Sequence, residues 1–572
     1  MEQMQATTSH SLLLLMDMRE RGQLCDVTLQ LDSGHEFKAH RSVLAIASPF
    51  FQTLFTGSLA DNRANQKIRL PQISLQLMKL IICYCYSRIV SFVSEQSVEA
   101  LIAISDRLMI FGLKDACCKF LEQQLSVYNC VGIWKFSRFY NCHPLEKQCR
   151  RFILRNFSSV SDQSDEWLEL DIEDVESFCR DEMLNSREEE HVYRAINNWL
   201  THSSSRSKND NWVGRLFHCL RIELVSSRFL RDVVSANKLV RSNKQTMNKI
   251  NNLNQAKKHS QFSNEAIKVK NARVPHQILI TIGGWTGRNP NDSVEIYDVR
   301  TNQWHFYESA LACGPRAYHS CVVLNRQIFI IGGYNGFEYF NSVRRWDVEK
   351  GKWHEVAPMN CRRCYVTSVS VEDKIYVFGG FDGISRLNSA EVFNPSTNQW
   401  SLTNPMATQR SDAGCAEAGG SIYVCGGFNG RECLDSVEKY DVTKKSWSTV
   451  ASMNTRRSGV SAINYNGSIY VLGGFDGRGR VSTVERYNES ENVWRFVSPM
   501  KVPRSNFSVA VIDDLLYVVG GYNGGQTIPN VECYNKQTNQ WTEVANLNRN
   551  RSALSLAVVS DLENMKELLR RN

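Results

Sequence analysis

The chain has 572 residues, of which 42% are hydrophobic and 22% charged, and its formal net charge at pH 7 is +8. This length allows three or four domains, each large enough to bury its own core. No apolar run reaches the ~18 residues of a membrane-spanning helix, which excludes such a span. The short apolar stretch Ser11–Met16 has no basic region before it, so it does not resemble a signal peptide.

The 18 cysteines are therefore expected to be reduced thiols of a cytoplasmic protein, packed in strands and helices. Cys361 and Cys364 have the spacing of half a zinc site, but no second pair follows at a suitable distance. We expect no metal and no other cofactor.

Residues 1–125 have the pattern of a mixed α/β domain. Val27, Leu29 and Leu31 alternate with polar residues, which predicts a strand in "CDVTLQLDSGHEFKAHR". Apolar residues at helical spacing predict helices over Ser42–Phe55 and Val98–Leu125.

Residues 126–237 are predicted to be helical. The stretch "EEEHVYRAINNWL" places Val192, Ile196, Trp199 and Leu200 on one face of a helix. We expect a second, all-α domain here.

Residues 238–276 form a polar, basic tract. Between positions 238 and 275 it has nine Lys or Arg and one Glu, a balance of +8 that equals the net charge of the chain. Its low apolar content predicts a flexible, solvated linker. The folded parts are then near neutral, so we expect no nucleic-acid partner.

From residue 277 the chain repeats itself six times. A glycine pair is followed 14 residues later by an aromatic residue and 21 residues later by a tryptophan. The glycine–tryptophan pairs are Gly283 and Trp304, Gly332 and Trp353, Gly379 and Trp400, Gly426 and Trp447, Gly473 and Trp494, and Gly520 and Trp541. An arginine recurs every 47 residues, at Arg316, Arg363, Arg410, Arg457, Arg504 and Arg551.

Each repeat predicts four short strands, which is the pattern of a propeller blade. In the third repeat these are "KIYVF", "NSAEVF", "QWSLT" and, after the arginine, a strand such as "CYVTSVSV". The first glycine pair has no arginine strand before it, whereas "RSALSLAVV" follows the last tryptophan. We therefore expect the C-terminal strand to complete the first blade and close a six-bladed propeller over residues 277–572.

The repeats resemble the kelch repeat in their glycine pair, their "VEKY", "VERY" and "VECY" segments, their late tryptophan and their "RRSG"-type strand start. The second repeat departs from this, with Arg344 and Trp346 in place of the Glu and the Tyr or Phe. "LCDVTLQL", "FKAHRSVLAIASPFFQTLFTG" and "YCYS" resemble a BTB domain, and "YNCVGIWKFSRFYNC" resembles a BACK domain. This order resembles the kelch-like family. The predicted fold is multidomain, with an α/β BTB domain, an all-α BACK domain and an all-β propeller.

No catalytic motif occurs: Gly-x-Ser-x-Gly, His-Glu-x-x-His and a phosphate loop are all missing. Tyr318 and His319 in "AYHS" supply two possible copper ligands, but one such pair in six blades is too little for a copper site. We expect a binding protein rather than an enzyme.

The resemblance implies a homodimer formed through the BTB domain, and docking of cullin-3 by the BTB domain and the first BACK helices. The propeller would hold a protein substrate for ubiquitin transfer. The family's apolar-x-Glu cullin motif corresponds to Leu59, Ala60 and Asp61, and Tyr86 matches its second tyrosine. Asp26 and His40 match BTB positions that we interpret as structural. The alternative function is an actin-binding or cytoskeletal scaffold protein.

Positions that differ among the blades are free to contact a ligand, whereas the constant arginines are expected to be structural, pairing with the Glu of "VExY". Two residues after each arginine the chain has Tyr318, Tyr365, Asp412, Gly459, Asn506 and Ala553. The loops after the glycine pairs carry Arg288, Tyr339, Arg386, Arg431, Arg478 and Gln526. We expect both series on one rim, binding an acidic segment of a partner protein. An ordinary solvated rim is the alternative.

Overall fold

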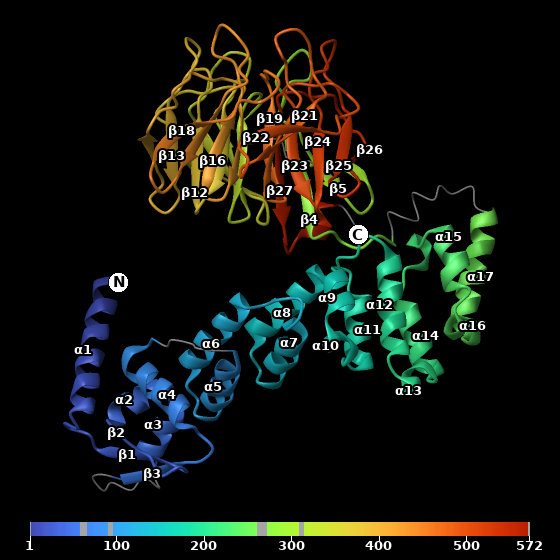
Figure 1. Cartoon of the computed structure of the whole chain (residues 1–572). Coiled ribbons are helices and arrows are strands. Elements are labelled where there is room, and N and C mark those ends of the chain that lie inside the picture. The colour runs from blue at the N-terminus through green and yellow to red at the C-terminus, as the bar shows by residue number, and fades with distance from the viewer. Residues whose placement is uncertain (1, 58–65, 90–94, 260–270, 308–313, 570–572) are drawn as a thin grey trace. The chain divides into compact units, whose positions relative to one another are not determined.

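The computed structural model describes residues 2–57, 66–89, 95–259, 271–307 and 314–569. The chain divides into two compact units, Met1–His259 and Ser260–Asn572, which are described separately (Figure 1). No helix in these described ranges is both long enough and apolar enough to span a bilayer.

The first unit begins with helix α1 (Glu2–Glu20) and a three-stranded sheet. Strand β1 (Val27–Leu31) pairs antiparallel with β2 (Glu36–Ala39) and parallel with β3 (Gln66–Leu70). Val27, Leu29 and Leu31 are buried, as their alternation predicts. The accompanying helices are α2 (Arg41–Ala47), α3 (Pro49–Thr56), α4 (Leu75–Ser87), α5 (Glu95–Arg107) and α6 (Phe111–Gln123).

The two long helices predicted in this region are each divided in two. Ser48 ends the first one, because its backbone is extended ahead of Pro49 and its side chain caps α3 by accepting the N–H of Phe51. Met109 lies between α5 and α6 with φ of 51°, a left-handed conformation that a continuous helix does not contain. Apolar spacing alone does not reveal either break.

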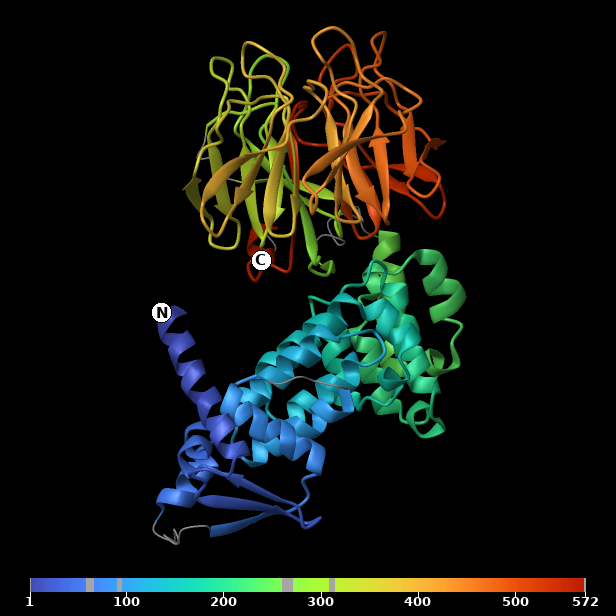
Figure 2. The same ribbon diagram turned by 60° about the vertical axis from the view of Figure 1, so that its left-hand side comes forward.

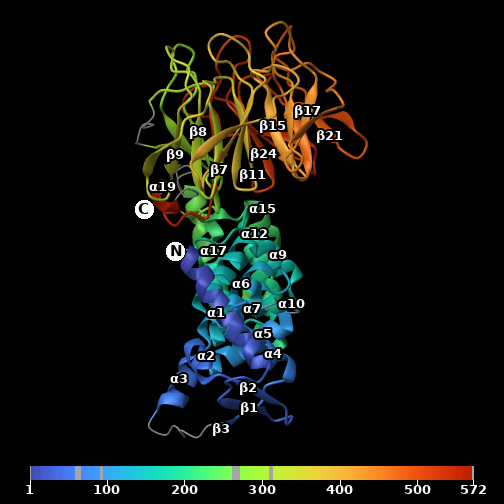
Figure 3. The ribbon, with the colours of Figure 1, turned by 90° about the vertical axis from the view of Figure 1, so that its left-hand side faces the viewer.

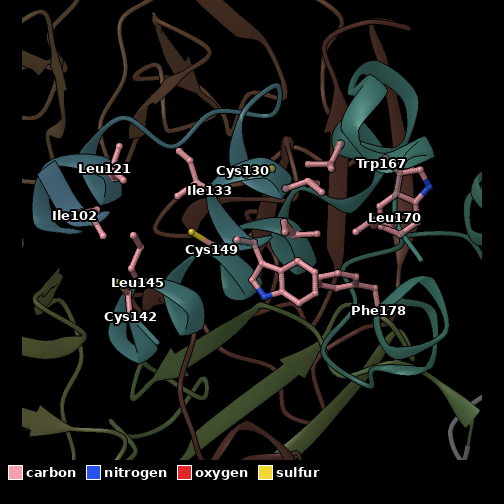
Figure 4. Packing of buried hydrophobic residues seen from close by; sticks show 14 of the residues in the cluster. Ile102, Leu121, Cys130, Ile133, Cys142, Leu145, Cys149, Trp167, Leu170 and Phe178 are labelled. Carbon is pink, nitrogen blue, oxygen red and sulfur yellow. The ribbon is translucent and has the colours of Figure 1, made fainter. Parts of the chain in front are cut away.

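The remaining helices continue the same unit. They are α7 (Cys130–Phe139), α8 (His143–Arg155), α9 (Phe157–Gln163), α10 (Asp165–Leu168), α11 (Ile172–Arg180), α12 (Glu189–Thr201), α13 (Ser204–Ser207), α14 (Asp210–Cys219) and α15 (Ser227–Phe229). A single apolar cluster extends from Val27 to Ile250. Figure 4 shows its central part, where Ile102 and Leu121 lie near Cys149 and where Trp167 lies near Phe178. The α/β part and the helical part therefore share one core.

The basic tract is not a flexible linker over its first half, and this prediction is wrong for residues 238–259. They form helices α16 (Lys238–Ser242) and α17 (Lys244–His259), which follow α15 within the first unit (Figures 1 and 3). Val240 and Ile250 are buried, and Asn243 caps α17 while donating to the Asp210 carbonyl at 3.0 Å. A few apolar residues on one face are enough to hold α16 and α17 in place, because α14 packs against them. Residues 260–270 lie outside the described ranges.

The second unit contains, in its described residues, six antiparallel four-stranded sheets arranged as a ring (Figure 2). Blade one consists of β27 (Ser555–Ser560), β4 (Gln277–Ile282), β5 (Val294–Asp298) and β6 (Gln303–Tyr307). Blade two has β7 (Ser320–Leu324), β8 (Gln327–Ile331), β9 (Val343–Asp347) and β10 (Lys352–Val356); blade three has β11 (Thr367–Val371), β12 (Lys374–Phe378), β13 (Ala390–Asn394) and β14 (Gln399–Thr403).

Blade four has β15 (Gly414–Ala418), β16 (Ser421–Cys425), β17 (Val437–Asp441) and β18 (Ser446–Val450); blade five has β19 (Ser461–Tyr465), β20 (Ser468–Leu472), β21 (Val484–Asn488) and β22 (Val493–Val497). Blade six has β23 (Ser508–Ile512), β24 (Leu515–Val519), β25 (Val531–Asn535) and β26 (Gln540–Val544), and a short helix α19 (Met565–Leu568) follows β27. Strand β27 pairs with β4 from Ser555 opposite Ile282 to Ser560 opposite Gln277, so the C-terminal strand closes the ring as predicted.

The repeated residues hold the blades together. A Cβ on Gly379 would lie 2.2 Å from the Arg410 carbonyl oxygen, and the φ of Gly379 is +58°, so the site requires glycine. Trp400 packs on Phe393 of its own blade with ring centroids 5.0 Å apart, and its indole N–H donates to Ala357 of the preceding blade at 2.8 Å. The tryptophan is therefore a wedge between neighbouring blades, as expected.

The periodic arginines form buried ion pairs with the Glu of the "VExY" segments, at N–O distances of 2.5 to 2.9 Å. The pairs are Arg363–Glu391, Arg410–Glu438, Arg457–Glu485, Arg504–Glu532 and Arg551–Glu295. Blade two has no such Glu, and Arg316 instead donates to Ser342 and lies 4.2 Å from the centre of the Phe340 ring. The structural role predicted for these arginines is confirmed.

Candidate partner-binding site

The residues two positions after the arginines form a closed ring of backbone hydrogen bonds. Each N–H donates to the carbonyl of the corresponding residue in the preceding blade, with N–O distances of 2.6 to 3.0 Å. The donor–acceptor pairs are Tyr318–Ala553, Tyr365–Tyr318, Asp412–Tyr365, Gly459–Asp412, Asn506–Gly459 and Ala553–Asn506. This ring, which we call the channel ring, lies at one end of the inner strands.

The side chains of the channel ring gather around a cavity of about 90 Å³. The Tyr318 and Tyr365 rings pack together with their centroids 4.2 Å apart. Asp412 accepts hydrogen bonds from Asn506 Nδ2 at 3.1 Å and from the Ser411 hydroxyl at 3.3 Å. Burial raises the pKa of Asp412 to about 6, because these two bonds and the nearby charge of Arg386 only partly offset the loss of water.

His319 also lines this cavity, beneath Tyr318. Burial and the nearby charge of Arg316 lower the pKa of His319 to about 3, so the ring is neutral at physiological pH. The described residues contain no group of three or more His, Cys, Asp or Glu side chains that could hold a metal ion.

The loops after the glycine pairs begin at the same end of the ring. The aromatic residue that follows each pair bridges to the residue just before the channel ring, as Trp285 does to Ser552 and Phe381 to Cys364. It also bridges to a residue five positions later in its own loop. These later residues are Pro290, Tyr339, Arg386, Cys433, Arg480 and Thr527.

This register corrects the predicted loop series, which combines different structural positions. Tyr339 and Arg386 occupy the bridging position, whereas Arg288, Arg431 and Arg478 lie two residues earlier in their loops. Those three arginines and Gln526 are exposed. Arg480 belongs with Tyr339 and Arg386, but the sequence does not show this, because the loop of blade five has two arginines, Arg478 and Arg480, only two residues apart.

Side chains at the bridging position lie between the aromatic residues of successive blades. The Arg386 guanidinium lies 4.1 Å from the Phe381 ring centre and 5.6 Å from that of Phe428. Arg480 lies 4.6 Å from Phe475 and 4.9 Å from Tyr522. Stacking of this kind holds a guanidinium in a fixed orientation, which favours recognition of a carboxylate.

Two apolar side chains at the loop tips were also missed by the sequence analysis. Phe337 and Ile384 are each 92% exposed, and they occupy the position at which blades four and five have Arg431 and Arg478. The same turn presents all four, since the N–H of each donates to an Asn or Asp side chain two residues earlier. The tips of blades two and three are therefore apolar, and those of blades four and five are cationic.

Of the three predicted cullin contacts, Tyr86 lies within the described residues. Leu59 and Asp61 lie outside the described residues. Tyr86 is fully buried: its hydroxyl donates to Nδ1 of His40 and accepts the His40 backbone N–H, both at 2.9 Å. Tyr86 is thus not a direct contact on the surface of this chain, because α4 turns its ring toward the core. Asp26 accepts the Arg41 N–H at 2.7 Å, at the start of α2, so it has a structural contact.

Comparison with known families agrees with this architecture. Residues 15–125 match the BTB/POZ domain, and residues 130–235 match the family described as BTB And C-terminal Kelch. Residues 269–456 match the KLHDC2/KLHL20/DRC7 Kelch-repeats domain, and residues 456–501 and 503–548 match the Kelch motif. No catalytic family is among these matches.

Similar proteins include Kelch-like protein 28 of Mus musculus, which is 32% identical over 334 residues, or 57% of this chain and 57% of that protein. Kelch-like protein 17 of Homo sapiens is 32% identical over 298 residues, or 51% of this chain and 45% of that protein. The matched region thus spans about half the length of these curated relatives. The chain thus contains matches to BTB, BACK and kelch domains in that order, and it is similar to kelch-like proteins.

Proposed function

We propose that the chain is a substrate adaptor of a cullin-3 RING ubiquitin ligase. In this proposal a BTB domain of residues 1–125 forms a homodimer and docks cullin-3 together with the first helices of a BACK domain of residues 126–237. The propeller holds the protein substrate. The observation that carries the proposal is the joining, in one chain, of a BTB–BACK body with a continuous core and a separate propeller.

An adaptor of this kind acts by positioning rather than by chemistry. Holding a substrate near the ligase raises the effective concentration of its lysines. A dimer presents two propellers, so modest affinity at each site becomes useful avidity. The protein needs no catalytic group or cofactor for this task.

The substrate surface is the end of the propeller that carries the channel ring and the glycine-pair loops, and its expected ligand is an acidic segment. Within the described residues, none of Arg386, Arg431, Arg478 and Arg480 has a carboxylate within ion-pairing distance. Arg386 and Arg480 are stacked on aromatic rings, and Arg431 and Arg478 are exposed at loop tips. Arginines that are oriented or exposed in this way are typical anchors for carboxylates. Arg288, at the exposed tip of the first loop, adds a further charge at this end.

The proposal is tested by calorimetry of residues 1–259 with the cullin-3 N-terminal domain. The fragment ends at His259 because α16 and α17 belong to the first unit. Submicromolar binding that is lost in a Leu59→Glu variant, with the variant still dimeric, would support the adaptor. If the intact dimer does not bind, the adaptor proposal fails, and direct binding to actin filaments becomes the next measurement.

We further propose that within the family the chain is most like kelch-like protein ten, the testis member. The basis is the set of short blocks "ILITIGGWTG", "PRAYHS", "QRSDA" and "NFSVAVIDDLLYVVGGYNG". This favours a role in spermatogenesis. Immunostaining of tissues checks it: a signal confined to tissues other than testis would contradict the proposal.

A further inference from the structure

The channel ring places large side chains where the backbone favours glycine. All six positions are left-handed, with φ between 50° and 63°, yet only Gly459 is a glycine. Asp412 and Asn506 tolerate this conformation, whereas a tyrosine adopts it only under strain. Tyr318 and Tyr365 nevertheless adopt it side by side. Strain of this kind persists where the surrounding structure imposes it, and it concentrates at ligand-binding sites.

The side chains held in this way have a common chemistry. Asp412 has a carboxylate in a buried setting, and it accepts hydrogen bonds from the neutral groups of Asn506 and Ser411. A carboxylate offers about four acceptor sites, so further donors can bind. The two tyrosine rings beside it present π faces, which attract cations.

We infer that the cavity bounded by Tyr318, Tyr365, Asp412 and Asn506 receives a basic side chain, lysine or arginine, of the protein that the propeller holds. This deepens the proposed function, on which it rests for the identity of the partner as a substrate. A volume of about 90 Å³ fits the end of one side chain and is too small for a cofactor or a folded segment.

The charged and titratable groups that face Asp412 are consistent with this ligand. They are Arg386, Tyr318, Tyr365, Cys364 and Cys433. Arg386 is the cation among them, and its guanidinium is stacked on Phe381 rather than paired with Asp412. The preferred partner is therefore a segment in which a basic residue has acidic neighbours. The basic residue would pair with Asp412, and the acidic residues would pair with Arg386 and Arg480.

The test uses the full chain and four small probes. These are arginine and lysine capped at both ends, and their neutral counterparts, capped citrulline and capped norleucine. Affinities are measured by ligand-observed NMR at pH 7.5 for the wild type, for Asp412→Asn and for a control, Asp382→Asn. The control removes one negative charge from a loop at the same end, and blades two, four and six already have Asn335, Asn429 and Asn523 at its position.

We expect the wild type to bind at least one cationic probe and to prefer it over its neutral counterpart. Asp412→Asn should weaken that binding roughly tenfold or more, the loss expected for a desolvated charge pair, and Asp382→Asn should leave it unchanged. Equal binding of the neutral probes, retention of affinity in Asp412→Asn, or no binding of either cation would overturn the inference.

Two control measurements test whether the variant folds and whether the proposed function holds. Asn506 occupies the ring position in blade six, so Asn suits the backbone at position 412, and thermal unfolding of the variant verifies this. Cullin-3 binding is measured on the same samples. Probe binding without cullin-3 binding would contradict the proposed function but support the basic-side-chain pocket. Cullin-3 binding without probe binding would contradict only the pocket.

Discussion

The two units of this protein are stabilised in different ways. In the first, one apolar cluster runs from Val27 to Ile250, so the α/β part and the helical part share one core. In the propeller, separate apolar clusters lie between successive blades. In addition, five of the six periodic arginines form a buried ion pair with a glutamate. In a continuous core, functional residues are difficult to recognise, because packing constrains nearly every position. In a repeated core they are easier to recognise, because a position that differs among the blades is not required for the fold of each blade.

The largest effect is expected from breaking one of the repeated ion pairs. Arg363→Met leaves Glu391 buried without its partner, which should cost about 3–5 kcal/mol of the free energy of unfolding of the propeller. Arg316→Met is the matched control, because Arg316 is paired with no glutamate of this series. Chemical denaturation measures both. If both variants lose the same unfolding free energy, the unpaired glutamate is not the cause of the loss in Arg363→Met.

The next effect tests whether the basic tract belongs to the first unit. Ile250 on α17 is buried, so Ile250→Ala should destabilise that unit by about 2–4 kcal/mol. Asn252→Ala, at an exposed position on the same helix, is the control. Urea denaturation of residues 1–259 gives the values. If both variants match the wild type, residues 238–259 behave as a linker after all.

A pH-dependent effect is expected at the channel ring. The pKa of Asp412 is raised from 3.8 to about 6 in the folded state, so folding favours its protonated form. Its contribution to stability is complete below pH 3.8 and is lost as the pH rises through about 6. Asp412→Asn should therefore be more stable than the wild type at pH 7.5, by on the order of 3 kcal/mol, and the difference should vanish near pH 4.

Thermal unfolding across this pH range measures that difference. Asp382→Asn is again the control, since hydrogen bonds from the Ile384 and Ser385 N–H groups help to lower the pKa of Asp382 and hold it ionised. A stability advantage of Asp412→Asn that is the same at pH 4 and pH 7.5 would show that the carboxylate does not titrate as described.

The smallest effect on stability is expected at the loop tips. Phe337→Ser and Ile384→Ser remove side chains that are 92% exposed, so the free energy of unfolding should change by no more than about 0.5 kcal/mol. Partner binding should nevertheless weaken, because exposed apolar side chains beside stacked arginines are suited to an interface. Thermal unfolding and binding of an acidic peptide library measure the two. A destabilised variant would mean that the tips pack within the propeller.

Much of the propeller is determined by local sequence. Gly379, Trp400 and Arg363 each have a role that one repeat can indicate, because the steric limit, the wedge and the ion pair recur at a fixed spacing. Closure by the C-terminal strand followed from counting strands. The first unit was less predictable: the breaks at Ser48 and Met109 depend on a cap and on one left-handed residue, neither of which changes the apolar spacing.

The sequence by itself determined the order of the domains, the six repeats and the closure of the ring, because these depend on periodic patterns and short-range sterics. Only the tertiary structure decided three other features: that the basic tract packs as α17, that Tyr86 lies in the core, and that Arg480 shares a position with Arg386. It also brought Tyr318, Tyr365, Asp412 and Asn506 around one cavity. These residues come from four different blades. They meet only because the blades are arranged in a ring, and the sequence of a single repeat does not contain that arrangement.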